Sequence, residues 1–213
     1  MRKLFFFAVA TIAIVTACGG DPGEPEPPEW PEMPQEQAGE GYYYYYSGEK
    51  EQFELDTRYA YLALREPIMP EDIVERGVEY DEFRLTDIAE DFQQYTKLIL
   101  EDGLSDRAYL AMLSDIKNAN PEIVIQPYLK TKDGVSVGMS NLFYVKLKRG
   151  DDTELLEWAA GQFDCVVDHQ NEFMPLWYTL ALTENSKRTT IECSAIFHES
   201  GLFSAAEPDL FDN

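Results

Sequence analysis

The chain has 213 residues and a formal net charge of −23, from 17 basic and 40 acidic side chains. This acidic excess argues against a nucleic-acid partner, because phosphate backbones are bound by lysine and arginine. Hydrophobic residues make up 45% of the chain, which is enough for a folded core. The length suits one large domain or two small ones.

Residues 1–18 have the pattern of an export signal. A basic start precedes an apolar run over residues 4–15, which is shorter than the ~20 residues that a membrane-spanning helix needs. "VTAC", residues 15–18, resembles the lipobox of bacterial lipoproteins. The resemblance implies cleavage before Cys18 and acylation of Cys18, which would anchor an exported protein to the outer membrane. The alternative is an ordinary secretory signal that contains a cysteine by chance.

Residues 19–41 are rich in proline and glutamate and contain no basic residue. Such a composition buries too little apolar surface to order itself, so we expect a disordered linker that holds the folded part away from the membrane. The acidic run after Cys18 also resembles the surface-export signal of lipoproteins from the Bacteroidetes group, which would place the protein on the cell surface.

Residues 42–140 are predicted to form an N-terminal α+β region, and whether it folds separately stays open. The aromatic run Tyr42 to Tyr46 favours a strand. "SGEK", residues 47–50, and "DTR", residues 56–58, predict two turns. The five tyrosines are alternatively a stacking platform for a sugar or a peptide.

Two helices are expected in the middle of this region. The first covers residues 85–100, with Thr86 as its N-cap and one face formed by Ile88, Phe92, Tyr95 and Ile99. The second covers residues 104–118, with Ser105 as its N-cap and an inward face of Tyr109, Met112, Leu113 and Ile116. A strand at 121–129 and a hairpin-like turn at 130–138 follow.

Residues 141–213 show a regular alternation of elements. We expect a strand at 141–148, a helix at 151–163, strands at 164–173 and 175–183, a helix at 185–200 and a final strand at 202–211. The first strand would place Phe143 and Val145 on one face and Tyr144 and Lys146 on the other. This βαββαβ order is that of a ferredoxin-like fold, an antiparallel sheet with two helices on one face.

The helix ends in this half carry recognisable signals. Asp151 and Glu154 fit a capping box for the first helix. Ser186 is the expected N-cap of the second helix, and Gly201 is expected to end it.

Catalytic and metal-binding patterns are not found in the sequence. Its two histidines are His169 and His198, and no serine lies in a G-x-S-x-G motif. Cys165 and His169 would share one strand face but lie roughly 13 Å apart, too far for a hydrogen bond or a shared metal. We therefore predict no enzyme activity, no metal and no cofactor. Cys165 and Cys193 would either pair as a disulfide or be buried as free thiols.

Four blocks of the chain resemble, in order, the pro-region of subtilisin-like serine peptidases from Bacteroidetes. They are "YYYYYSGEK" at 42–50, "NLFYVKLK" at 141–148, "NEFMPLWYTLALTENSK" at 171–187 and "FHESGLFSAAEPDLF" at 197–211. In that family a catalytic domain follows the last block, whereas here Asn213 is the last residue. The resemblance implies a non-catalytic, pro-domain-like lipoprotein.

The resemblance also implies how such a module acts. Pro-domains pack the open face of their sheet on the peptidase and lay a C-terminal tail in its substrate groove, so the expected partner is a subtilisin-like serine peptidase that is inhibited or chaperoned. The tail would comprise Glu207, Pro208, Asp209, Leu210 and Phe211.

In such a complex Glu172, in the loop between the second and third strands, would cap a helix N-terminus of the peptidase. Alternatively, Leu210 and Phe211 seal the core and Glu172 is a solvated acid. Two alternative functions stay open: a surface module that binds a peptide or a glycan, and an inactive remnant of a peptidase.

Overall fold

The computed structural model describes residues 30–36, 41–64, 79–82, 94–100 and 104–212. The chain divides into a short unit, Met1–Pro31, and a main unit, Glu32–Asn213. The elements of the main unit are β1 (Tyr42–Tyr46), β2 (Glu49–Leu64), β3 (Glu79–Glu82), β4 (Gln94–Ile99), α1 (Asp106–Ala119), β5 (Val124–Lys130), β6 (Ser136–Lys146), α2 (Thr153–Gly161), β7 (Cys165–Gln170), β8 (Trp177–Leu182), α3 (Thr190–Glu199) and β9 (Ala205–Asp212).

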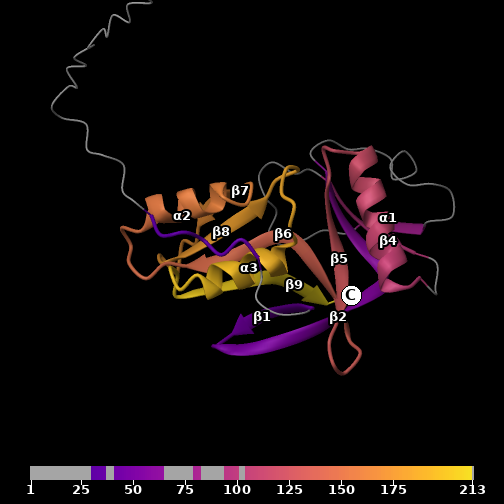
Figure 1. Ribbon diagram of the computed structural model, residues 1–213, viewed down its shortest axis with the longest axis horizontal. Helices are drawn as coiled ribbons and strands as arrows, with labels where there is room; N and C mark the ends of the chain where they lie inside the picture. Colours follow the sequence, from indigo (N-terminus) through magenta and orange to yellow (C-terminus); the bar gives the residue numbers. More distant parts are fainter. Residues whose placement is uncertain (1–29, 37–40, 65–78, 83–93, 101–103, 213) are drawn as a thin grey trace, which may run out of the picture. The chain divides into compact units, whose positions relative to one another are not determined.

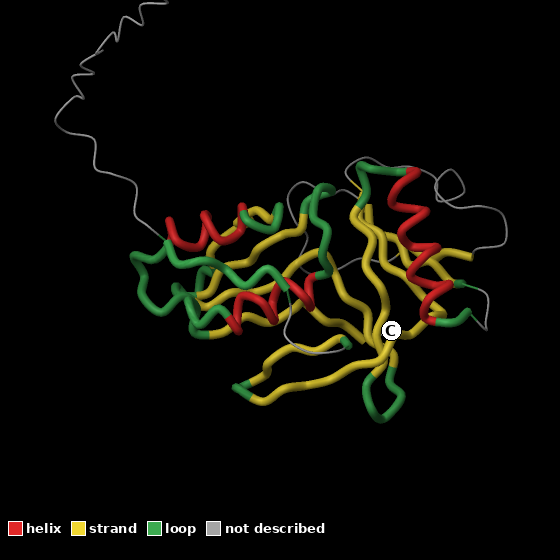
Figure 2. Tube along the Cα trace, in the orientation of Figure 1, coloured by secondary structure: helices red, strands yellow, loops and turns green. Residues whose placement is uncertain are grey.

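These strands join into one antiparallel sheet, which confirms the predicted α+β class. The strand order is β3-β4-β2-β5-β6-β8-β7, with β1 added to β2 and β9 added to β6. Helix α1 lies beside β2, β4 and β5, whereas α2 and α3 lie beside β6, β7, β8 and β9 (Figure 1). The helices therefore fall into two groups along the sheet (Figure 2).

The tyrosine run is a strand, as predicted, and the "SGEK" turn follows it. Ser47 and Gly48 both have a positive φ, 51° and 84°, which suits the tight turn between two twisted antiparallel strands. The second predicted turn, at residues 56–58, is wrong. There β2 continues through an irregularity between Asp56 and Ala60, and the Asp56 carboxylate accepts hydrogen bonds from the Arg58 guanidinium at 2.6 and 2.8 Å.

The predicted helix at 85–100 is wrong where it can be compared with the structure. Thr86, Ile88 and Phe92 lie outside the described residues, and residues 94–99 form strand β4. Tyr95 and Ile99 are four residues apart, a spacing that places them on one side of a strand as well as of a helix. Pairing of β4 with β2 on one side and β3 on the other decides in favour of the strand.

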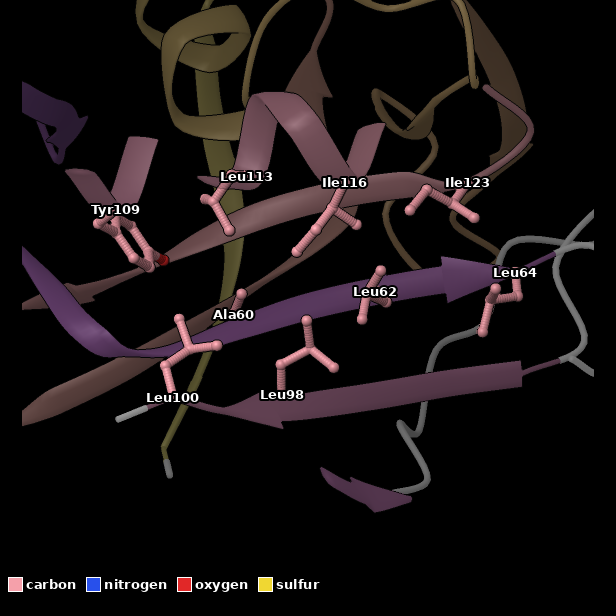
Figure 3. Close-up of a cluster of buried hydrophobic side chains, with 9 residues drawn as sticks. All are labelled: Ala60, Leu62, Leu64, Leu98, Leu100, Tyr109, Leu113, Ile116 and Ile123. Atoms are coloured by element: carbon pink, nitrogen blue, oxygen red, sulfur yellow. The ribbon is translucent and has the colours of Figure 1, made fainter. Parts of the chain in front are cut away.

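Helix α1 confirms its prediction and forms a core with the sheet. The Ser105 hydroxyl accepts a hydrogen bond from the Ala108 amide at 3.4 Å, as an N-cap does. The buried side chains of α1 point at β2 and β4, and the cluster comprises Ala60, Leu62, Leu64, Leu98, Leu100, Tyr109, Leu113, Ile116 and Ile123 (Figure 3). The Tyr109 hydroxyl donates to the Tyr59 carbonyl at 2.6 Å, which ties the helix to β2.

The C-terminal half follows the predicted order of elements, β6-α2-β7-β8-α3-β9. Its strands are adjacent in the order β9-β6-β8-β7, and all pairs are antiparallel. Phe197 of α3 is central to the core, because its ring centroid lies 5.3 Å from that of Phe143, 5.9 Å from that of Phe163 and 5.2 Å from that of Phe203.

Both predicted N-caps in this half are wrong. Asp152, not Asp151, precedes α2 and makes no side-chain cap, because its carboxylate accepts from the Arg149 amide at 3.1 Å instead. Helix α3 begins after Thr189, which forms a capping box with Glu192.

The predicted cap Ser186 instead donates to the Asp164 carbonyl at 2.6 Å and so fastens the loop before α3. The predicted helix end is confirmed. Gly201 has a φ of 65°, and its amide donates to the His198 carbonyl at 3.1 Å.

The last residues of the predicted linker are described by the structure. Met33 has 3% of its surface exposed, and the Gln35 carbonyl accepts a hydrogen bond from Arg188. This short stretch of the 19–41 segment therefore packs within the main unit.

Gly138→Ala should destabilise the protein, because a Cβ at this position would lie 2.2 Å from the Phe211 ring. The ring is held between Tyr61 and Tyr128, with centroids 6.1 and 6.0 Å away, so it cannot move aside freely. We expect a loss of ~1–3 kcal/mol in the free energy of unfolding, measured by urea titration. Gly161→Ala in α2 is the control, because its added Cβ meets nothing within 4 Å beyond its chain neighbours and the backbone of its own helix. Equal stability of the two variants would contradict this account.

Candidate protein-binding site

The predicted tail, residues 207–211, lies in strand β9 and pairs with β6. Leu210 packs against a buried cluster that includes Val137 and Met139, and Phe211 packs against Tyr61 and Tyr128. In this arrangement the side chains of Leu210 and Phe211 both pack against the core. Peptidase binding by these two residues stays a prediction, and it requires them to leave the sheet.

Glu207 and Asp209 occupy more polar surroundings than the rest of the tail. The Asp209 carboxylate accepts hydrogen bonds from the Ser140 hydroxyl at 2.7 Å and from the Tyr144 hydroxyl at 3.0 Å. Glu207 lies opposite Tyr144 in the register and is half-buried. Burial raises the pKa of the Glu207 carboxyl above its usual value, because desolvation disfavours the ionised form.

The sheet of β6 to β9 has one face away from α3, which we name the outer face. Phe143 contacts Phe197 of α3, so its neighbour Tyr144 points to the opposite side. Directly paired residues of antiparallel strands share a face. The pairings with β7, β8 and β9 therefore define the outer face as Tyr144, Lys146, His169, Trp177, Thr179 and Glu207.

The outer face combines aromatic, cationic and polar groups. The Lys146 ammonium lies 5.8 Å from the Trp177 ring centroid. The His169 ring lies 2.7 Å from the Asp168 carboxylate through Nδ1 and 3.3 Å from the Thr179 hydroxyl through Nε2. Such a mixture of aromatic, charged and polar side chains is typical of surfaces that bind another protein.

The position of His169 corrects one expectation from the sequence. Cys165 pairs with Leu182 and His169 with Thr179, with a register shift between Val167 and His169. The extra residue turns His169 to the outer face while Cys165 stays in the core. The two side chains therefore lie on opposite faces of β7, not on one face.

The loop between β7 and β8, residues 171–176, is ordered yet presents apolar side chains to solvent. The Asn171 side chain accepts hydrogen bonds from the amides of Phe173 and Met174 at 3.0 and 2.9 Å. Nevertheless, Phe173 is 90% exposed and Met174 is 50% exposed. Glu172 is exposed between Asn171 and Phe173, as the sequence predicted for a loop acid. We name residues 171–176 the β7–β8 loop.

Sequence reasoning missed Phe173 and Met174. The sequence predicted a strand as far as Phe173, whereas β7 ends at Gln170. The available signal was two large apolar residues directly before a proline, but sequence alone does not show whether such residues fold inward. Large exposed apolar side chains on a held loop often mark a contact with another protein.

A cleft lies between α1, β5 and the loop before α3. It has a volume of about 430 Å³ and is lined by apolar residues such as Leu110, with Lys117, Lys187 and Arg188 among its polar residues. The Lys117 ammonium donates to the carbonyls of Pro121 and Glu184 at 2.8 and 2.6 Å. Its pKa is lowered by burial. The sequence carried no motif that predicted this cleft.

The tyrosine run is largely engaged within the protein. Tyr43 is fully buried, and Tyr45 stacks on His198 with ring centroids 4.2 Å apart. The hydroxyls of Tyr43 and Tyr45 both donate to the Glu199 carboxylate, at 2.7 and 3.1 Å. Tyr46, which is 56% exposed, is the member most accessible to a ligand.

Cys18 lies outside the described residues, so its acylation stays a prediction. Within the described ranges, no three or more His, Cys, Asp or Glu side chains are grouped to hold a metal ion. Within the same ranges, none of the helices is both long and apolar enough to cross a bilayer. No family model, curated protein or solved structure matches the chain.

Glu207→Gln should make stability less dependent on pH. The raised folded-state pKa of Glu207 means that its ionised form destabilises the fold, so the wild type gains stability as pH falls through that pKa. We expect the variant to be more stable than the wild type at pH 7 and equally stable near pH 4, measured by urea titration. Glu157→Gln on the exposed side of α2 is the control. A constant difference between Glu207→Gln and wild type at both pH values would contradict the assignment.

Proposed function

We propose that the C-terminal half is a ferredoxin-like, pro-domain-like module that binds a subtilisin-like serine peptidase and inhibits or chaperones it. The observation that carries the proposal is the strand order β9-β6-β8-β7 with α2 and α3 as the two crossovers. A split βαβ arrangement requires this order. In this proposal the module catalyses no reaction and is held at the outer membrane through Cys18.

The binding surface in this proposal is the outer face together with the β7–β8 loop. An interface needs a few desolvated anchors, and aromatic residues are the commonest ones. Trp177 on the outer face and Phe173 in the loop would supply such anchors. Lys146, beside the Trp177 ring, would add a charge that selects partners with a complementary acid.

Glu172 has a separate role in the proposal. It is an exposed carboxylate beside the exposed Phe173, so it would reach a helix N-terminus of the partner while Phe173 packs next to it. A carboxylate at a helix N-terminus stabilises by ~0.3–1 kcal/mol at an exposed position and more when it is partly buried. Burial in the complex would therefore strengthen this contact.

The segment 207–211 would act after this first contact. Its release from β6 would break the packing of Phe211 on Tyr61 and Tyr128 and the hydrogen bonds to Asp209. Deleting the segment would remove β9 from the sheet. A truncation would consequently confound binding with folding, and point substitutions in the exposed loop test the proposal more cleanly.

The cleft between α1 and the loop before α3 favours a second candidate function, a surface module that binds a peptide or a glycan. Its volume of about 430 Å³ lies within the range of small-ligand sites. This candidate uses different residues from the first, so variants in the β7–β8 loop distinguish the two.

Residues 19–213 should inhibit bacterial subtilisins when titrated against hydrolysis of a chromogenic peptide. Phe173→Ser and Glu172→Ala should each weaken inhibition by roughly 10-fold, which corresponds to ~1.4 kcal/mol for the loss of one interface anchor. Val135→Ser is the matched control, because Val135 is also an exposed apolar residue, 53% accessible, in the β5–β6 turn.

Absence of inhibition for every subtilisin tested would contradict the proposal, and so would equal inhibition by all three variants. Binding of a peptide or glycan that persists in the loop variants, without inhibition, would favour the second candidate.

A further inference from the structure

Cys165 and Cys193 come from different elements and meet in the core of the C-terminal half. Cys165 begins β7 and is 5% exposed, whereas Cys193 lies in α3 and is fully buried. Both are free thiols in the structure. The Cys165 thiol donates to the Phe163 carbonyl at 3.5 Å, and the nearby Cys165 together with burial raises the pKa of the Cys193 thiol.

Independent packing brings the two cysteines together. Phe163, two residues before Cys165, lies against Phe197 with ring centroids 5.9 Å apart. Phe197 follows Cys193 by about one helical turn, so both point from the same face of α3. Cys165 pairs with Leu182, on the buried side of the sheet. The packing of Phe163 on Phe197 therefore holds the residues just before β7 against this face of α3.

We propose that Cys165 and Cys193 form an intramolecular disulfide when the chain folds after export. One cysteine thiolate attacks the disulfide of a thiol–disulfide oxidoreductase and forms a mixed disulfide, with release of one thiolate from the oxidant. The second cysteine then attacks the mixed disulfide and releases the other thiolate. The pair loses two protons and two electrons, and the oxidant is reduced to a dithiol.

The burial of both thiols determines when the reaction takes place. The attacking species is the thiolate, and an apolar environment disfavours it. In the folded protein Cys193 is shielded from any oxidant and its pKa is raised. The disulfide therefore forms while α3 is still undocked from β7, and the finished core then protects it from reductants.

The disulfide closes a loop that contains the rest of β7, all of β8 and the first turn of α3. Such a cross-link restricts the unfolded chain and so stabilises the folded one. This inference does not depend on peptidase binding. It rests on the export that residues 1–18 predict, because disulfides persist in oxidising compartments.

The test is the thiol state of the full chain after expression with its own leader in a Gram-negative cell. Cells are quenched in acid, and the protein is denatured, alkylated with N-ethylmaleimide and digested for mass spectrometry. We expect a linked peptide pair that contains Cys165 and Cys193, lighter by two hydrogens than the two free peptides, and alkylation of both only after reduction. Alkylation of both without reduction, or a link from either to Cys18 or to another chain, would overturn the proposal.

A second readout is thermal unfolding of the exported protein with and without dithiothreitol. Reduction should lower the Tm of the wild type by roughly 5–15 °C, as expected for the opening of a closed loop in a chain of this size. The double variant Cys165→Ala, Cys193→Ala should show no shift with the reductant. A wild-type Tm that does not respond to reduction, or an equal shift in the double variant, would also overturn the proposal.

Discussion

Strand β6 is the element on which the rest of the fold depends, because it pairs with β5 of the first half and with β8 and β9 of the second half. Strand β9 pairs with both ends of β6 along one edge. On the opposite edge, β5 pairs with the start of β6 and β8 pairs with its end. The irregular segment between Met139 and Phe143 makes this possible. Two buried oxygen atoms of this segment accept hydrogen bonds: the Ser140 carbonyl accepts from the Thr190 hydroxyl at 3.0 Å, and the Asn141 side-chain oxygen accepts from the Tyr61 hydroxyl at 3.3 Å. One strand therefore joins the core under α1 to the core under α3.

In this arrangement the side chains of the outer face project from strands that are held by backbone pairing. Tyr144 and Glu207 project from the paired strands β6 and β9, and Trp177 begins β8. Backbone pairing on both sides of β6 fixes these side chains more firmly than a loop would. The β7–β8 loop leads directly into Trp177 and is itself held by the Asn171 side chain. A preorganised surface of this kind loses little entropy when it binds, which is what the proposed binding module requires.

Local signals in the sequence predicted the helix and the turn that are formed by residues close together in the chain. They failed for a strand that is defined by pairing with distant segments. Helix α1 was predictable from its spacing and Ser105, and the β1–β2 turn from Ser47 and Gly48. Strand β4 was not predictable, because the four-residue spacing of Tyr95 and Ile99 fits both a helix and a strand. The strands that pair with β4 are also distant in sequence. For the site, Glu172 was placed in the correct loop, but the exposure of Phe173, the proximity of Cys165 to Cys193 and the packing of Phe211 all depend on tertiary structure.

The most direct test of the account is hydroxyl-radical footprinting of residues 19–213 alone and mixed with a subtilisin whose catalytic serine is blocked by phenylmethylsulfonyl fluoride. Aromatic and methionine side chains oxidise readily when exposed, so Phe173, Met174 and Trp177 serve as reporters. The account predicts that these three are protected in the mixture, while Leu110 and Tyr46, which are also exposed, are oxidised as before. Unchanged oxidation of the three, or protection confined to Leu110 and the cleft beside it, would contradict it.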